Sequence, residues 1–234
     1  YAGRTVIEKL AKIPTQVDIA SEFRYRDPII EKDELVIVIS QSGQTADTIE
    51  AMREAKRRGA KTLAITNVVG STVSIEADAV LHTRAGVEIA VASTKAYITQ
   101  LMALYMIALE LGRINGVLSE DKYSYYLGEL EGMSEKSKLM LNTKEQMQKL
   151  ASERFMEKSV FYIGRGVDNA LAMEASLKLK EISYIHSEAY AAGELKHGTI
   201  ALIEDDTLVV ALATQKSLIE KTASNIQEVK ARGA

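Results

Sequence analysis

The chain has 234 residues, of which 47% are hydrophobic and 26% charged, and its formal net charge is −3. These values are ordinary for a folded globular protein and leave room for one large domain or two smaller ones. Without a block of like charge, the sequence predicts no binding to nucleic acid or to a membrane surface. It has no cysteine and three scattered histidines, so no metal site is predicted and a reducing cytoplasm is expected.

The first half of the chain alternates between helical and strand patterns. Residues 35–39 form an unbroken run of Leu, Val and Ile, which is typical of a strand buried on both faces of a parallel sheet. Helical spacing follows this run and ends at Gly59. The predicted elements are a helix over 1–12, strands over 16–19, 35–39, 61–67 and 79–83, a loop over 86–95, and a helix over 93–111.

The second half begins with a charged segment that lacks any strand pattern. Residues 122–158 read as one or two helices that link two α/β units. The predicted elements beyond them are strands over 159–163 and 207–213 and helices over 169–183 and 218–230. This alternation predicts doubly wound parallel sheets, with a first subdomain over 1–121, the link, and an incomplete second subdomain over 159–234.

A polar loop follows the strand over 35–39, with the sequence Ser40-Gln41-Ser42-Gly43-Gln44-Thr45. A strand, loop and helix in this order bring hydroxyls, backbone N–H groups and a helix N-terminus to one point, where an anion such as phosphate can bind. The loop is neither GxGxxG nor a P-loop, so nucleotide binding is not indicated. Ser and Thr are also common helix N-caps, and on the residues alone this second interpretation is equally open.

The two halves share an internal repeat. Residues 20–23 and 35–41 match 186–189 and 208–215, and the second copy carries seven more residues between these landmarks, within 191–198. The second copy also lacks the glycine of Ser42-Gly43. The repeat therefore indicates one half that holds an anion and one that carries reactive groups.

Three charged residues interrupt the apolar pattern over 170–183, which otherwise predicts a mostly buried helix. Glu174, Lys178 and Glu181 fall within roughly 60° of arc on this helix. One interpretation is a Glu174–Lys178 ion pair on a half-exposed face. The other is a carboxylate base that moves a proton beside a carbonyl. His197, inside the extra segment of the second repeat, is either a surface residue or an acid–base group.

Four motifs resemble a known family. They are Ser-Gln-Ser-Gly-Gln-Thr-Ala-Asp-Thr (40–48), Val-Ala-Ser-Thr-Lys-Ala (91–96), Leu-Lys-Leu-Lys-Glu-Ile-Ser-Tyr-Ile-His (177–186) and Glu-Ala-Tyr-Ala-Ala-Gly-Glu-Leu-Lys-His-Gly (188–198). Together they resemble the isomerase half of the glutamine–fructose-6-phosphate aminotransferases, or glucosamine-6-phosphate synthases. The first motif is common to many sugar-isomerase (SIS) domains of flavodoxin-like fold, and the last two are more specific to the synthases.

The resemblance implies a role for each site residue. The phosphate would be held by Ser40, Gln41, Ser42 and Thr45. The sugar hydroxyls would be held by Val91, through its backbone, and Ser93. His197 would open the fructose ring, and Glu181 would carry a proton between C1 and C2 with Lys178 close by. No metal or organic cofactor is implied.

The resemblance also implies partners outside this chain. A glutaminase domain would supply ammonia, a Gly-Thr-Ser turn would precede Tyr1, and a C-terminal tail with a Schiff-base lysine would follow Ala234. The chain is therefore expected to be a piece cut at both ends. The piece alone is not expected to be active. Apolar surface on 93–111 and on the link predicts a homodimer. The alternatives are a related phosphosugar deglycase or isomerase, and a non-catalytic SIS sensor, which would need the Ser40–Thr45 loop but neither Glu181 nor His197.

Overall fold

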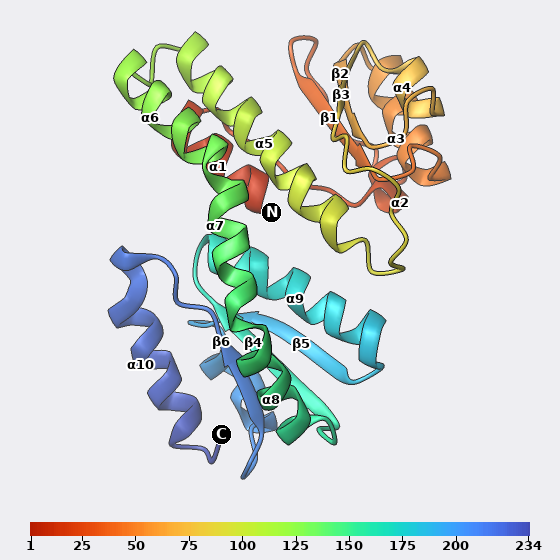
Figure 1. Ribbon diagram of the computed structural model, residues 1–234. Helices are drawn as coiled ribbons and strands as arrows, with labels where there is room; N and C mark the ends of the chain where they lie inside the picture. The colour runs from red at the N-terminus through yellow and green to blue at the C-terminus, as the bar shows by residue number, and fades with distance from the viewer. The chain divides into compact units, whose positions relative to one another are not determined.

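The computed structural model describes all residues from 1 to 234, and they form two compact units (Figure 1). The N-terminal unit is Val6–Ser124. The C-terminal unit is Tyr125–Ala234 together with Tyr1–Thr5. Each unit contains one three-stranded parallel sheet. This is the α/β class with parallel sheets that the alternating pattern predicts.

The sheet of the N-terminal unit has the strand order β1-β2-β3. At the carboxyl edge, Ser40 pairs in register with Thr66, and Thr66 with His82, so the loops after all three strands leave from one edge. The elements are α1 (Ala2–Ala11), α2 (Ala20–Phe23), β1 (Leu35–Ser40), α3 (Ala46–Arg57), β2 (Lys61–Thr66), α4 (Thr72–Glu76), β3 (Ala79–His82), α5 (Thr94–Ile114) and α6 (Glu120–Glu131).

Helices cover both faces of this sheet, as expected for a doubly wound fold. On one face, Val38 of β1 packs with Ile49 and Met52 of α3. On the other face, Ile37 packs against a core that includes Ile7 of α1 and Ala108 of α5. Side chains alternate along a strand, so the continuous apolar run supplies both cores at once.

The strand β1 is less buried than its sequence predicts. Leu35 is 47% exposed and Ile39 is 41% exposed, so the expectation of burial on both faces is wrong at these positions. The reason is topological, because β1 pairs only with β2 and lies at the edge of the sheet.

The strand predicted over 16–19 is not formed. These residues are an irregular segment that leads into α2, so residues 20–23 are helical, whereas residues 186–189 lie in a strand. The repeat predicted from the sequence therefore holds for the strands at 35–40 and 208–211 and fails for the landmark at 20–23 and 186–189. A strand needs a hydrogen-bonding neighbour, and residues 186–191 pair with the strand at 159–164 while residues 16–19 pair with no strand.

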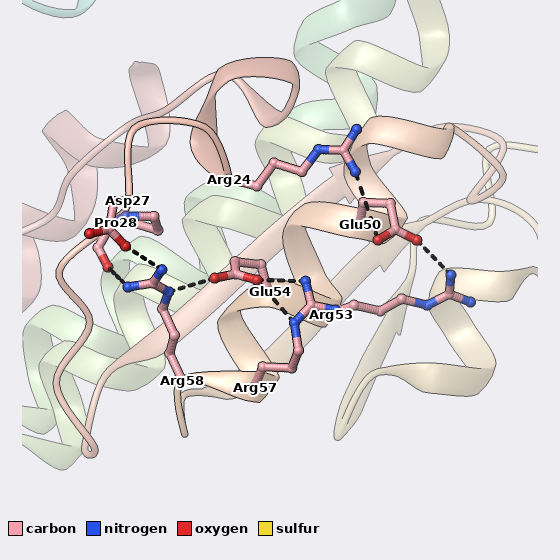
Figure 2. Close-up of polar contacts among 8 residues, drawn as sticks. All are labelled: Arg24, Asp27, Pro28, Glu50, Arg53, Glu54, Arg57 and Arg58. Atoms are coloured by element: carbon pink, nitrogen blue, oxygen red, sulfur yellow. Dashed lines mark hydrogen bonds and ion pairs between the residues drawn. The ribbon is translucent and has the colours of Figure 1, made fainter.

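An ion-pair network fixes helix α3, the helix that starts at the polar loop (Figure 2). Arg58, after the last turn of α3, donates to Glu54 at 2.6 Å and to the carbonyl of Pro28 at 2.7 Å. The hydrogen bond from Arg58 to Glu54 is the main cause that lowers the pKa of the Glu54 carboxyl. Arg53 donates to Glu50 at 2.7 Å. Single surface pairs stabilise little, but this set ties α3 to the segment that precedes β1.

The C-terminal unit has the strand order β5-β4-β6. Its middle strand β4 lies between two parallel neighbours. One of them, β5, was not predicted, because its residues are mostly small or polar. The elements are α7 (Met133–Met140), η1 (Leu141–Thr143), α8 (Lys144–Arg154), β4 (Ser159–Gly164), α9 (Val167–Ser183), β5 (His186–Ala191), η2 (Leu195–His197), η3 (Thr199–Leu202), β6 (Leu208–Ala211), η4 (Lys216–Leu218) and α10 (Ile219–Lys230).

Helix α9 is not mostly buried, which corrects the expectation from its apolar sequence. Its buried residues are Asp168, Ala172 and Ser176, spaced four apart on the stripe that faces β4 and β5. Ile182, by contrast, is 65% exposed. Ser176 fixes the stripe to β5, because its backbone carbonyl accepts a hydrogen bond from the Ser187 hydroxyl at 2.8 Å. Only one face of α9 is covered by the sheet of its own unit.

The segment over 122–158 is helical, as expected, and contains most of α6 and all of α7 and α8. None of these three helices has a buried residue. The chain passes from the N-terminal to the C-terminal unit between Ser124 and Tyr125, within α6. The division at 1–121, 122–158 and 159–234 stays a prediction. No helix of the chain is both long enough and apolar enough to cross a lipid bilayer.

Candidate phosphosugar site

The loop Ser40–Thr45 folds around its own hydroxyl groups. The buried Ser40 Oγ accepts a hydrogen bond from the Gly43 N–H at 3.0 Å and lies 3.0 Å from Thr45 Oγ1. Ser42 Oγ accepts from the Gln44 N–H at 3.2 Å. The Gln41 carbonyl accepts from the Asn67 N–H at 3.1 Å, which ties the loop to the end of β2. The structure thus brings Ser40, Ser42 and Thr45 together in one loop. The buried hydroxyl of Ser40 holds this loop through its contacts with Gly43 and Thr45.

The N-terminus of α3 is open beside this loop. Thr45 is its N-cap residue by position, yet its side chain makes no capping hydrogen bond. The N–H groups of the first helical turn have no acceptor within the helix. They carry the positive end of the helix dipole, which favours an anion. The missing cap is compatible with an anion site, although Ser71, the N-cap residue of α4, makes no capping bond either.

Gly43 allows the loop to lie against β2 and α4. Its φ is +64°, and a Cβ atom at this position would lie 2.2 Å from Ser71 Oγ and 2.8 Å from Thr66 Oγ1. The Ser71 hydroxyl is buried and has no hydrogen-bond partner. The left-handed conformation is costly for a residue with a Cβ, and the close approach to Ser71 leaves no room for one. The close packing was not evident from the sequence, since Thr66 and Ser71 are far along the chain.

The segment with Val91 and Ser93 follows β3, at the same edge of the sheet. Asn67, after β2, holds this segment near its start, because its side chain accepts from the Ala85 N–H at 2.8 Å and donates to the Gly86 carbonyl at 2.7 Å. Val91 is 92% exposed, which leaves its backbone accessible. Ser93, the N-cap of α5, has a left-handed conformation with φ of 51°, and its side chain makes no capping hydrogen bond.

The charged stripe of α9 forms a three-residue cluster in the C-terminal unit. Lys178 Nζ lies 2.6 Å from Glu181 Oε2 and 3.4 Å from Glu174 Oε1. The expected Glu174–Lys178 pair is therefore present, but the shorter contact is to Glu181. The three side chains are 20–33% exposed, so the cluster is partly open to solvent.

The ammonium of Lys178 is held in its charged form. Burial is the largest single effect and lowers its pKa, but the hydrogen bond to Glu181 and the attraction of Glu174 together outweigh burial, so the pKa of Lys178 is raised. Lys178 therefore presents a positive charge between two carboxylates at neutral pH. A carboxylate beside a fixed cation and open to solvent can accept or return a proton.

His197 ends the short helix η2. Leu195, two residues earlier, is buried in the core of the unit and anchors the turn. The imidazole itself is exposed, so it is free to meet a ligand.

The loop after β6 is the counterpart of Ser40–Thr45 in the repeat. Its polar groups form hydrogen bonds with other residues of the chain. The Thr214 N–H donates to the buried carboxylate of Asp168 at 2.9 Å, and the Thr214 hydroxyl donates to the other carboxylate oxygen. Gln215 Nε2 donates to the Arg165 carbonyl at 2.6 Å. These polar groups of the loop are thus already paired within the chain, with a carboxylate and with a backbone carbonyl. The sequence repeat did not reveal this, because Asp168 is 46 residues from Thr214.

The predicted site residues fall into two groups. The phosphate loop, Val91 and Ser93 belong to the N-terminal unit, and Lys178, Glu181 and His197 belong to the C-terminal unit. No group of three or more His, Asp and Glu side chains is arranged to hold a metal ion.

These features define a class of protein. The SIS domain family model matches residues 2–110 and 155–234, and the chain belongs to this family.

Individual relatives are more specific. The chain is 63% identical, over 99% of its length, to the glutamine–fructose-6-phosphate aminotransferase [isomerizing] of Caldanaerobacter subterraneus subsp. tengcongensis, and 60% identical to that of Clostridium tetani. It spans 38% of the length of each of these relatives. Among solved structures, it is similar to the C-terminal domain of the Francisella tularensis glucosamine-fructose-6-phosphate aminotransferase. The TM-score is 0.97 and the identity 41%, over 99% of this chain and 66% of that one.

Proposed function

We propose that this chain is the isomerase part of a glutamine–fructose-6-phosphate aminotransferase, which converts fructose 6-phosphate and ammonia to glucosamine 6-phosphate. The observation that carries the proposal is the 63% identity over 99% of the chain to a protein of that name. Two features of the geometry support it: a loop of hydroxyl groups beside the uncapped N-terminus of α3, and the carboxylate–ammonium cluster of α9. A sensor that only binds phosphosugars would not require the cluster.

The phosphate of the sugar binds at Ser40–Thr45. Ser42 and Thr45 donate hydroxyl hydrogen bonds, and the first N–H groups of α3 complete the site, while Gln41 and Ser40 shape it. The backbone at Val91 and the hydroxyl of Ser93 hold the sugar hydroxyls. Hydroxyl and N–H donors fit the oxygens of a phosphate monoester.

The chemistry belongs to the α9 cluster and His197. The exposed imidazole of His197 opens the fructose ring by proton transfer. Ammonia then condenses with the C2 carbonyl and water leaves. Glu181 takes a proton from C1 and returns it to C2. The imine nitrogen gains a proton and the C1 hydroxyl gives one up to solvent, so that C1 becomes the aldehyde carbon and C2 carries the amine. Lys178 stabilises the negative charge that develops during this transfer. No organic cofactor is needed for this proton movement.

The proposal is tested by assaying the intact protein with fructose 6-phosphate and ammonia. Formation of glucosamine 6-phosphate is the expected result. Release of ammonia from glucosamine 6-phosphate without the forward reaction would indicate a deglycase instead. Binding of both sugars without turnover would indicate a sensor. Sequencing the gene on both sides of this chain tests the proposed partner, a glutaminase domain that supplies the ammonia.

Replacing Ser42 by Ala is expected to weaken phosphosugar binding by about 1–2 kcal/mol, because one hydrogen bond to a charged group is lost. Isothermal titration calorimetry with glucosamine 6-phosphate measures the change. Ser137→Ala, on the exposed face of α7, is the matched control and should bind as the wild type does. Equal affinities for wild type and Ser42→Ala would place the phosphate elsewhere.

A homodimer is expected. The helices α6–α8 contain no buried residue, and apolar side chains such as Leu139, Met140 and Leu150 are exposed on them. Exposed apolar surface of this kind favours association. Light scattering of the intact protein should give twice the chain mass at micromolar concentration. A monomer mass would contradict the expectation, and Leu139→Lys should shift a true dimer toward monomer.

A further inference from the structure

The segment between β3 and α5 is folded around the side chain of Glu88. Val87 and Ile89 on either side of it are exposed, whereas Glu88 is turned inward and partly buried. One carboxylate oxygen accepts from the Ala90 N–H at 3.2 Å, and the other accepts from the Ala96 N–H at 3.2 Å. The Glu88 carboxylate therefore joins the two ends of the segment that contains Val91 and Ser93.

Glu88 also caps helix α5. Ala96 is the third residue of this helix and is almost fully buried, so its N–H has no access to solvent. A carboxylate at the first turn satisfies such a group and interacts favourably with the helix dipole. The N-terminus of α5 is thus closed by the chain itself, whereas that of α3 is open.

Two further contacts hold the same segment. The Ser93 N–H donates to the Ala90 carbonyl at 3.0 Å, and Lys95 Nζ donates to the Val87 carbonyl. Within this frame Ser93 keeps its left-handed conformation, with φ of 51° and ψ of 43°. A residue with a Cβ adopts this conformation at a cost, so it persists only where surrounding contacts impose it.

We propose that Glu88 is a positioning residue for sugar recognition: its carboxylate fixes the Val91–Ser93 segment so that the Val91 backbone and the Ser93 hydroxyl meet the sugar hydroxyls. This inference rests on the proposed function. The hydrogen bonds of Glu88 go to Ala90 and Ala96 and not to the phosphate loop, so it acts on the sugar part of the ligand and leaves the phosphate part unaffected.

The test compares two ligands in the intact protein by calorimetry, fructose 6-phosphate and inorganic phosphate. Glu88→Ala should weaken fructose 6-phosphate binding about tenfold, because two hydrogen bonds to a charged group are lost, and should change phosphate binding by less than about twofold. Glu88→Gln should be intermediate, since its single amide oxygen can accept from only one of the two N–H groups, and it carries the same comparison if Glu88→Ala does not fold.

Glu31→Ala is the matched control. It removes an exposed carboxylate that precedes β1, at the end of the sheet opposite to the phosphate loop, and should change neither affinity. Unchanged fructose 6-phosphate binding in the Glu88 variants, or an equal loss for both ligands, would overturn the inference. If the wild type bound neither ligand, the proposed function would fail first, so the two failures are distinguishable.

Discussion

Glu181→Gln is expected to keep phosphosugar binding and to lose most of the aldose–ketose interconversion. The amide is nearly the same size as the carboxylate but cannot accept a proton, and loss of a general base commonly costs about 10²–10⁴-fold in rate. The measurement is the exchange of solvent deuterium into C1 or C2 of the bound phosphosugar, followed by NMR in the intact protein. Calorimetry on the same sample shows whether the sugar still binds.

Glu174→Gln is the matched control for this experiment. Both glutamates contact Lys178, but Glu181 lies at 2.6 Å and Glu174 at 3.4 Å. The Glu174 variant should therefore show a modest change in rate or stability, because it weakens only the longer ion pair. If the Glu181 variant exchanges at the wild-type rate and the Glu174 variant does not, Glu174 is the base.

Gly43→Ala should remove phosphosugar binding almost completely. The alanine would require a left-handed conformation, at roughly 1–2 kcal/mol, and its Cβ would overlap with Ser71, at roughly 1–3 kcal/mol. Ser71 is nearly fully buried and cannot move aside without disturbing the start of α4. The loop would therefore leave the position that its hydroxyls need. Calorimetry and thermal unfolding of the variant measure the two consequences.

Gly70→Ala separates the two causes of this effect. Gly70 has a similar φ of +75°, but a Cβ there would meet nothing within 4 Å. It should cost only the conformational part and leave ligand binding largely intact. Equal losses of affinity in the two variants would mean that close packing under Gly43 does not shape the site.

The sequence was sufficient to predict those features that depend only on residues close together in the chain. The run of Leu, Val and Ile over 35–39, followed by Ser40-Gln41-Ser42-Gly43, predicted a strand and a polar loop at its end, and the structure has both. The stripe of Glu174, Lys178 and Glu181 followed from helical spacing alone, and the ion pairs are formed. Their roles in catalysis and binding stay predictions.

The errors have a common physical cause, because each depends on which neighbours a segment finds. Residues 186–191 contain no β-branched residue and become a strand because β4 offers a partner. Residues 16–19 have a sequence more typical of a strand, but no neighbouring strand pairs with them. The apolar helix α9 stays half exposed because the sheet of its own unit covers only one of its faces.

Contacts between distant residues were likewise beyond sequence reasoning. The Gly43 contact with Ser71 and the Asp168 contact with Thr214 join residues that no periodicity relates. Glu88 is closer to its partners, but an inward-facing carboxylate among exposed apolar neighbours gives no sequence signal of its own. Gly43, Asp168 and Glu88 each shape a loop at the carboxyl end of a strand.

The most direct test is a crystal structure of the intact protein with glucosamine 6-phosphate bound. We expect the phosphate at the N-terminus of α3, with its oxygens within about 2.5–3.2 Å of Ser42 Oγ, Thr45 Oγ1 and backbone N–H groups of that loop. The loop after β6 should hold no phosphate, with Asp168 still bonded to Thr214. A phosphate bound beside Thr214, with the Ser40–Thr45 loop unoccupied, would show that the phosphate site lies in the C-terminal unit and that the proposed assignment is wrong.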